Sequence, residues 1–130
     1  MHFVSKFIRN YPMTTLVIVA IWILCLIPIP ETPLSHVTFI DKWTHVIMYL
    51  ALSLLIGYER WHCHAPLTIR QQALYIFLMP SLMGALLEIL QATCTNGMRS
   101  GEWLDFVADA SGSAIAFFIC ILLARCLSKA

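Results

Sequence analysis

The sequence predicts an all-α, polytopic membrane protein in which four transmembrane helices form a compact bundle, a single domain spanning residues 1–130. Hydrophobic residues make up 60% of the chain and charged residues only 12%, against roughly 25% charged in an ordinary soluble protein. So few charges cannot cover a water-exposed surface, and so apolar a chain is not disordered. The net charge of +1 gives no basic excess, so no nucleic-acid partner is predicted.

The first predicted span covers residues 13–29, an apolar run without a charged residue. A series of prolines that begins at Pro28 ends it, because proline cannot continue the helical hydrogen-bond ladder. Lys6 and Arg9 precede the run, as in a signal peptide, but no A-x-A-like cleavage site follows it. We therefore expect an uncleaved membrane anchor.

The other predicted spans cover residues 41–58, 72–91 and 103–127. The second is long enough to cross only if its polar start lies at membrane depth. Pro80 lies within the third, where we expect a kink whose freed carbonyl is satisfied by neighbouring helices. A single run of this kind could be a buried helix of a soluble protein, but four in one short chain indicate a membrane bundle.

Basic residues are divided unequally between the two sides of such a bundle. Only Lys42 and Arg99 fall on one side. The side that carries both chain ends holds Lys6, Arg9, Arg60, Arg70, Arg125 and Lys129. Because cytoplasmic loops are enriched in Lys and Arg, we expect both termini in the cytoplasm.

Acidic residues show the opposite distribution, since all except Glu59 fall on the outer half. We expect Glu31 and Glu102 to be ordinary solvated loop residues. Glu88 and Asp109 each lie one to two turns inside a predicted span. An acid at that depth is unfavourable unless it is paired, hydrated or protonated, which makes both residues functional candidates.

Helical spacing groups the polar residues of three spans into stripes at similar depth. The stripes are Asp41, His45 and Tyr49 at i, i+4, i+8; Glu88 and Gln91 at i, i+3; and Asp105, Asp109 and Gly112 at i, i+4, i+7. Because lipid cannot solvate them, we expect all three stripes to face one shared cavity. The alternative is a polar network that only holds the helices together, in which Asp41 or Tyr49 is the partner of His45. Ala108, Gly112 and Ala116 form a small-residue stripe that predicts close helix packing.

The outer polar residues carry more acid than base: Asp41, Glu88, Asp105 and Asp109 against Lys42 and Arg99 leave a charge of −2. A divalent cation at this carboxylate cluster, a shared proton or a cationic ligand group could offset that excess. Alternatively, the two bases and the helix N-termini could hold an anion such as phosphate. No cofactor is evident and no metal site is assigned, because the common metal, hydrolase and nucleotide motifs are absent from the sequence.

Three segments stand in order on the second, third and fourth spans: Asp41-Lys42-x-x-His45-x-x-x-Tyr49, Glu88-x-x-Gln91 and Arg99-x-x-x-x-x-Asp105-x-x-x-Asp109-x-x-Gly112. In order, spacing and hydropathy they resemble the D-K-x-x-H-x-x-x-Y, E-x-x-Q and R-x-x-x-x-x-D-x-x-x-N-x-x-G segments of the VanZ-like membrane proteins, from about residue 12 to 127. Asp109 departs from the pattern, since the family commonly shows Asn there. An acid can accept a metal ion or a proton where an amide only hydrogen-bonds.

The resemblance implies a small protein of the bacterial inner membrane that acts on the cell envelope, in a family whose founding relative is associated with resistance to the glycopeptide teicoplanin. It implies a polar, outward-facing site for a membrane lipid, such as an envelope lipid head group, or for a glycopeptide. A non-catalytic assembly subunit is the alternative. A small transporter is disfavoured, because the inner halves of the spans are almost wholly apolar.

Whether the protein is an enzyme stays open at this point, as does its oligomeric state. In an enzymatic form, His45 or Glu88 would transfer protons, Lys42 and Arg99 would hold phosphate, and the two aspartates of the last span would orient groups or a cation. The candidate catalytic residues are therefore His45, Glu88, Asp105 and Asp109, and the candidate ligand-binding residues are Asp41, Lys42, Tyr49, Gln91 and Arg99.

Overall fold

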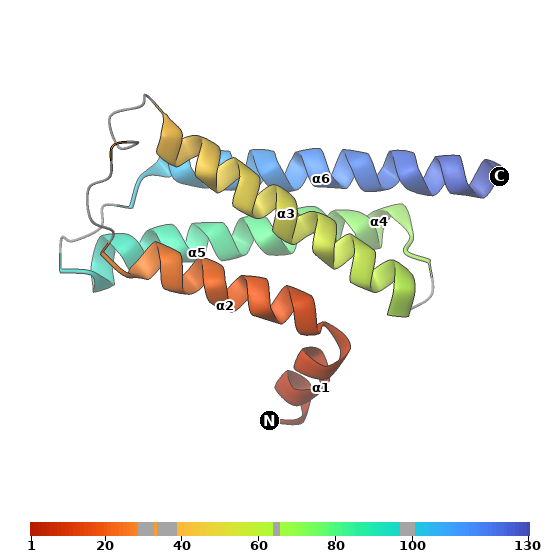
Figure 1. The fold of residues 1–130 in the computed structure, drawn as a ribbon, viewed down its shortest axis with the longest axis horizontal. Coiled ribbons are helices and arrows are strands. Elements are labelled where there is room, and N and C mark those ends of the chain that lie inside the picture. The colour runs from red at the N-terminus through yellow and green to blue at the C-terminus, as the bar shows by residue number, and fades with distance from the viewer. Residues whose placement is uncertain (29–32, 34–38, 64–65, 97–100) are drawn as a thin grey trace.

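The chain folds into a bundle of helices that run side by side along one axis (Figure 1). The computed structural model describes residues 1–28, 33, 39–63, 66–96 and 101–130. The elements within them are α1 (His2–Asn10), α2 (Pro12–Leu26), α3 (Ile40–Cys63), α4 (Ile69–Gln72), the π-helical segment η2 (Ala73–Leu78), α5 (Met79–Cys94) and α6 (Trp103–Lys129). The predicted all-α class is confirmed.

Among the described residues, three helices are long and apolar enough to cross a membrane. They are α3, the continuous helix Ile69–Cys94 formed by α4, η2 and α5, and α6. The α1–α2 pair meets the same criteria only as one span with a bend of 106°. On its own α2 is about 22 Å long, shorter than the roughly 30 Å hydrocarbon core. The described residues therefore contain three candidate spans, or four if the bent α1–α2 pair is counted as one.

Helix α1 was not among the elements predicted from the sequence. It turns away from the bundle axis (Figure 1). The break falls at Tyr11, whose φ of −133° and ψ of 60° are not helical, directly before Pro12 at the start of α2. Phe3 and Ile8 are exposed, and Lys6 and Arg9 lie on the same short helix. Apolar and basic residues on one helix are typical of segments that lie along a membrane interface.

Glu59 fixes the start of α2 from the far end of α3. Its Oε1 accepts a hydrogen bond from the Met13 N–H at 2.9 Å, and its Oε2 accepts one from the Thr14 N–H at 3.1 Å. The first N–H groups of a helix have no partner within the helix, and the helix dipole favours a negative charge there. The one acid that the sequence placed on the inner half therefore has a structural role, with only 6% of its surface exposed.

The predicted distortion at Pro80 takes the form of the π-helical segment η2. Proline has no N–H and its ring collides with the carbonyl four residues earlier, so a regular α-helix cannot pass through it. Directly before Pro80 the Met79 N–H bonds to the carbonyl of Leu74, five residues back. One turn of wider helix thus accommodates the proline within the span, as π-bulges commonly do.

Helices α3 and α6 approach each other closely through the small residues of α6. A Cβ atom built on Gly112 would lie 2.9 Å from the backbone nitrogen of Leu50, and it would also collide with the carbonyl of Val46. One residue further along, the Ser113 hydroxyl is 3.1 Å from the hydroxyl of Ser53. Ala108 and Ala116 are buried in the bundle. The close packing predicted from the small-residue stripe is confirmed.

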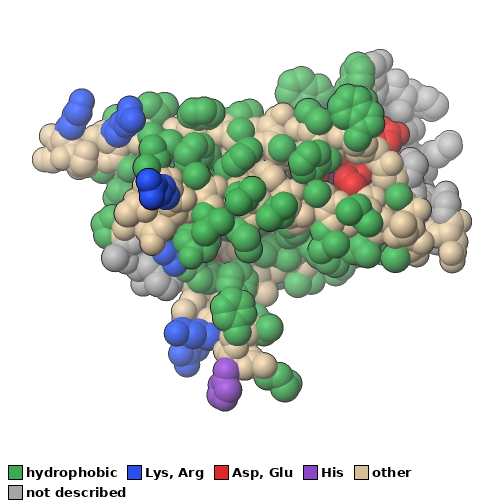
Figure 2. All heavy atoms as spheres, turned by 180° about the vertical axis from the view of Figure 1, so that it is seen from behind, with side chains coloured by type: hydrophobic (Ala, Val, Ile, Leu, Met, Phe, Trp, Pro, Cys, Tyr) green, Lys and Arg blue, Asp and Glu red, His purple; other side chains and the backbone are tan. Residues whose placement is uncertain are grey.

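The outer surface of the bundle is largely apolar. Figure 2 shows hydrophobic side chains over the middle of the molecule, Lys and Arg side chains towards one end, and Asp or Glu side chains towards the other. The exposed apolar side chains of this surface include Ile47, Leu82, Ile89, Phe118 and Leu122. Soluble monomers rarely expose contiguous apolar patches of this extent, so the chain is an integral membrane protein.

We expect Gly112→Ala to lower the free energy of unfolding by about 1–3 kcal/mol, because the added methyl group would meet rigid backbone of α3. The matched control is Ser111→Ala, at an exposed position whose hydroxyl bonds only to the Val107 carbonyl of its own helix. That control should change stability by less than about 0.5 kcal/mol. Unfolding in mixed detergent micelles measures both, and equal stabilities would contradict the α3–α6 contact.

Candidate functional site

Polar side chains from α3, α5 and α6 meet at the end of the bundle where α3 and α6 begin and α5 ends (Figure 1). We call this group the acidic cluster; it consists of Lys42, His45, Tyr49, Glu88, Asp105 and Asp109. Apart from Lys42, each member is less than a tenth exposed: Tyr49 0%, Asp109 1%, His45 3%, Asp105 4% and Glu88 8%. Polar side chains of all three helices therefore come together as a buried cluster, while the shared cavity expected between them stays a prediction.

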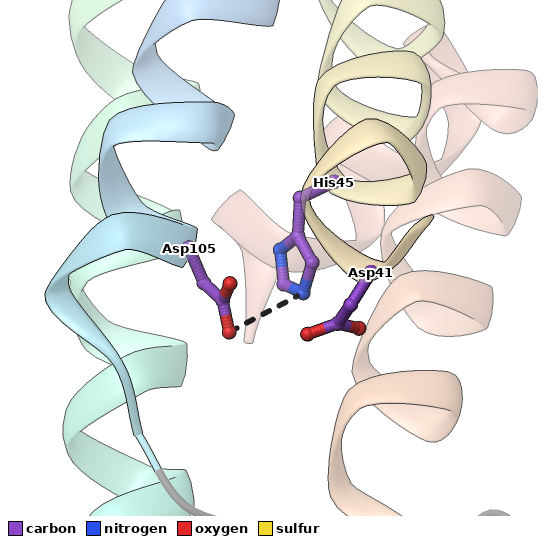
Figure 3. A group of neighbouring side chains, drawn as sticks. All are labelled: Asp41, His45 and Asp105. Atoms are coloured by element: carbon purple, nitrogen blue, oxygen red, sulfur yellow. Dashed lines mark ion pairs between the residues drawn. The ribbon is translucent and has the colours of Figure 1, made fainter. Parts of the chain in front are cut away.

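The contact at the centre of the cluster joins His45 of α3 to Asp109 of α6. The His45 Nδ1 lies 2.8 Å from the Asp109 Oδ1, and in the neutral imidazole Nδ1–H donates to that oxygen. The other ring nitrogen, Nε2, is 4.0 Å from the Asp105 Oδ2. In Figure 3 the ring lies between the carboxylates of Asp105 and Asp41. The partner of His45 is thus on another helix, rather than Asp41 or Tyr49 of its own helix as the alternative interpretation supposed.

Lys42 supplies positive charge at the edge of the cluster. Its Nζ lies 2.6 Å from the Asp105 Oδ1 and 2.6 Å from the Glu102 Oε2, and 3.6 Å from the Asp41 Oδ2. A buried carboxylate such as Asp105 is tolerated when an opposite charge compensates it. Lys42 therefore holds the beginnings of α3 and α6 together while it offsets their acids.

Glu88 is held by the residue that precedes α6. Its Oε2 accepts a hydrogen bond from the Glu102 backbone N–H at 2.9 Å, which satisfies a free donor at the start of that helix. Glu102 was predicted to be an ordinary solvated residue. Its side chain is half-exposed, but it also binds Lys42, so it connects two members of the cluster.

Three buried oxygen atoms of the cluster have no hydrogen-bond partner among the described residues. They are the Tyr49 hydroxyl, the Glu88 Oε1 and the Asp109 Oδ2. A buried polar atom without a partner costs about 1–3 kcal/mol, so such atoms mark a place where an ion, a proton or a polar ligand group fits. Gly84 of α5 lets the helix backbone pack directly against one of them, because a Cβ there would lie 2.6 Å from the Asp109 Oδ2.

The remaining predicted site residues lie at the margin of the cluster or outside it. The Asp41 side chain is 58% exposed at the start of α3. Gln91 is buried, but its Nε2 donates to the Cys25 carbonyl at 2.7 Å and so ties α5 to α2. Tyr49, although a member of the cluster, also packs with its ring in the hydrophobic core around Ile21. Arg99 lies outside the described residues.

Sequence reasoning missed two contributors to the site. Gly84 carried a usable signal, because it precedes Glu88 by four residues and so shares its face of α5. The position of Glu102 along the chain provided no such indication, because its contact with Lys42 depends on how the beginnings of α3 and α6 are placed beside each other.

Chemically, the cluster offers carboxylates and one imidazole at short mutual distances. Two trios each place one potential ligand atom per residue within 4.8 Å of the others: Asp41, His45 and Asp105, and His45, Glu88 and Asp109. Such groups can share protons, accept a cation or bind the polar part of a ligand. His45 belongs to both trios and is therefore the central residue.

Fold and site together define the protein as a small multi-span membrane protein with a buried, mostly acidic polar cluster at one end of its bundle. Comparison of the chain with models of protein families, with characterised proteins and with solved structures finds no match.

We expect Asp109→Ala to lower the free energy of unfolding by about 1.5–3 kcal/mol, because His45 loses its hydrogen-bond acceptor in a dry environment. Asp109→Asn keeps a carbonyl oxygen for the Nδ1–H and should retain most of that stability. The double variant His45→Ala/Asp109→Ala should lose less than the sum of the two single variants, since the residues act as a pair. Additive losses in mixed-micelle unfolding would refute the pairing.

Proposed function

We propose that this chain is a VanZ-like protein of the bacterial cytoplasmic membrane whose acidic cluster binds the polar head group of an envelope lipid. The observation that carries the proposal is the cluster itself: buried carboxylates that retain unpartnered oxygens at the end of a lipid-exposed bundle. The order and spacing of the three sequence segments support the family. In this proposal, a response to glycopeptide antibiotics would follow from the binding of that envelope lipid.

The depth of the cluster suits a lipid head group. Trp43 and Trp103 stand on the first turns of α3 and α6, at the same end of the bundle, and their side chains are 63% and 73% exposed. Exposed tryptophans are enriched where the hydrocarbon meets the head groups. The acidic cluster is within one or two turns of them, so a head group at that level reaches it without leaving the interface.

The charges of the cluster favour a ligand with a polar, charged group. Carboxylates of Glu88 and Asp109 suit an amine or a cation, while Lys42 suits a phosphate. Arg99, which lies outside the described residues, is the second base that the sequence offers for a phosphate. In a catalytic form of the proposal, the imidazole of His45 would transfer a proton and Asp109 would orient it, as in other His–carboxylate pairs.

A non-catalytic assembly subunit is the second candidate, because several cluster contacts join different helices. His45 with Asp109 and Lys42 with Asp105 both link α3 to α6. A small transporter has less support, because a polar path would have to continue towards the other end of the bundle. The cavity of about 240 Å³ nearer that end is lined mainly by apolar side chains such as Leu54, Ile76 and Leu123.

The orientation in this proposal puts the acidic cluster outside and both termini in the cytoplasm. The start of α2 and the end of α6 lie at the bundle end opposite the cluster, together with Arg60 and Arg70, as the positive-inside rule requires.

For the head-group proposal, we expect the purified protein to carry a phosphorylated envelope lipid enriched over the bulk membrane, measured by mass spectrometry in nanodiscs. Arg99→Ala and Asp109→Ala should each reduce that lipid about tenfold or more, because each removes a charged side chain proposed to bind the head group. Arg125→Ala, an exposed base at the other end, is the matched control and should retain it. Unchanged lipid in both Arg99→Ala and Asp109→Ala would overturn the proposal, and loss of protein abundance together with the lipid would favour the assembly subunit.

For the orientation, we expect a membrane-impermeant maleimide on intact cells to label a variant whose only cysteine is Cys94, at the end of α5. A variant whose only cysteine is Cys126, near the end of α6, should react only after permeabilisation. Both thiols are free and exposed in the structure, so accessibility to the reagent reports the side of the membrane. The reverse labelling pattern would invert the topology.

A further inference from the structure

We propose that the acidic cluster binds one divalent transition-metal ion of the Zn²⁺ or Mn²⁺ class, with His45, Glu88 and Asp109 as its protein ligands. The inference deepens the proposed function, because the ion would occupy the same site as the head group. Its test measures the metal alone, so the two proposals can fail separately.

The spacing of the three residues suits a common ion. One potential ligand atom from each of His45, Glu88 and Asp109 lies within 4.8 Å of the other two. In the tetrahedral geometry of Zn²⁺, ligand atoms about 2.0–2.2 Å from the ion are separated from each other by roughly 3.3–3.6 Å. Only a small closing movement of the side chains would therefore bring all three atoms onto one ion.

The two carboxylates are oriented and each keeps a free oxygen. Glu88 uses its Oε2 to accept from the Glu102 N–H, and Asp109 uses its Oδ1 at the His45 ring. The Glu88 Oε1 and the Asp109 Oδ2 remain buried and without a hydrogen-bond partner. Both side chains are more than nine-tenths buried, so water outside the bundle does not satisfy these oxygens.

Gly84 lets the backbone of α5 pack directly against the Asp109 carboxylate. Any side chain at this position would place a Cβ 2.6 Å from the Asp109 Oδ2 and so displace that ligand. Gly84 and Glu88 are four residues apart and so share one face of α5. The face of α5 that carries the Glu88 ligand is thus the face that packs against the second carboxylate.

The surroundings of the three ligands fit metal-bound histidine. When Nδ1 binds the ion, the bond to the ion replaces its hydrogen bond to the Asp109 Oδ1, and the imidazole proton resides on Nε2, 4.0 Å from the Asp105 Oδ2. Metal-ligating histidines usually donate their other N–H to a carboxylate, and Asp105, which Lys42 holds, would accept that bond once it moves within hydrogen-bond distance. One imidazole with two carboxylates suits Zn²⁺ or Mn²⁺ better than Mg²⁺ or Ca²⁺, which prefer oxygen alone.

The test uses the full-length, tag-free protein in detergent, stripped with a chelator and then dialysed against Zn²⁺ or Mn²⁺. We expect about one ion per wild-type chain by elemental mass spectrometry, with a melting temperature that rises on Zn²⁺ addition. Glu88→Gln and Asp109→Asn keep the side-chain shapes but remove a ligand charge, and should each weaken binding by about tenfold or more. Gly84→Ala should weaken it as well.

Glu59→Gln is the matched control, because Glu59 is a buried acid that caps α2 far from the cluster. It should bind the ion as the wild type does. Wild-type protein that binds no more metal than the Glu88→Gln/Asp109→Asn double variant, and is not stabilised by Zn²⁺, would overturn the site. Lipid enrichment without metal would remove this inference alone, and metal without lipid enrichment would remove the head-group proposal alone.

Discussion

The constraint on which this structure depends is that a bilayer cannot solvate a charge or a free hydrogen-bonding group. Each buried acid of the bundle therefore finds its partner on another part of the chain. Asp109 of α6 is held by His45 of α3, Asp105 of α6 by Lys42 of α3, and Glu59 of α3 by the first N–H groups of α2. Because these partners lie on different helices, the pairs that compensate the acids also fix the rotation and depth of the helices.

Small residues make those pairs possible. Gly112 lets the backbone of α6 approach that of α3 three residues after Asp109, which brings the carboxylate within reach of the His45 ring. Gly84 does the same on the other side, where α5 passes close to the Asp109 carboxylate. Close packing and polar pairing are thus one feature of the bundle, because a larger residue at either glycine would move the helices that carry the partners.

The sequence could predict the helices and the depth of the polar residues, because both follow from patterns within one segment. The apolar runs indicated the spans, and i, i+4 spacing put His45 and the two aspartates of α6 on inward faces. Pairing across helices could not be predicted this way, since spacing along one helix does not report how its neighbour is rotated. A partner on its own helix was one open alternative for His45, and Glu102 was expected to be a solvated loop residue. The capping of α2 by Glu59 of α3 could not be predicted for the same reason, because it also joins two different helices.

The acids of this protein separate into two kinds by how completely they are satisfied. Glu59 has a hydrogen-bond donor on each of its oxygens, as expected of a residue whose role is structural. Glu88 and Asp109 are as deeply placed, yet each has one oxygen engaged and one free. A network that served only to hold helices together would gain by satisfying both, since a buried unpartnered oxygen costs stability. The free oxygens therefore distinguish Glu88 and Asp109 from the structural Glu59, and they are the atoms that the proposed ligand would bind.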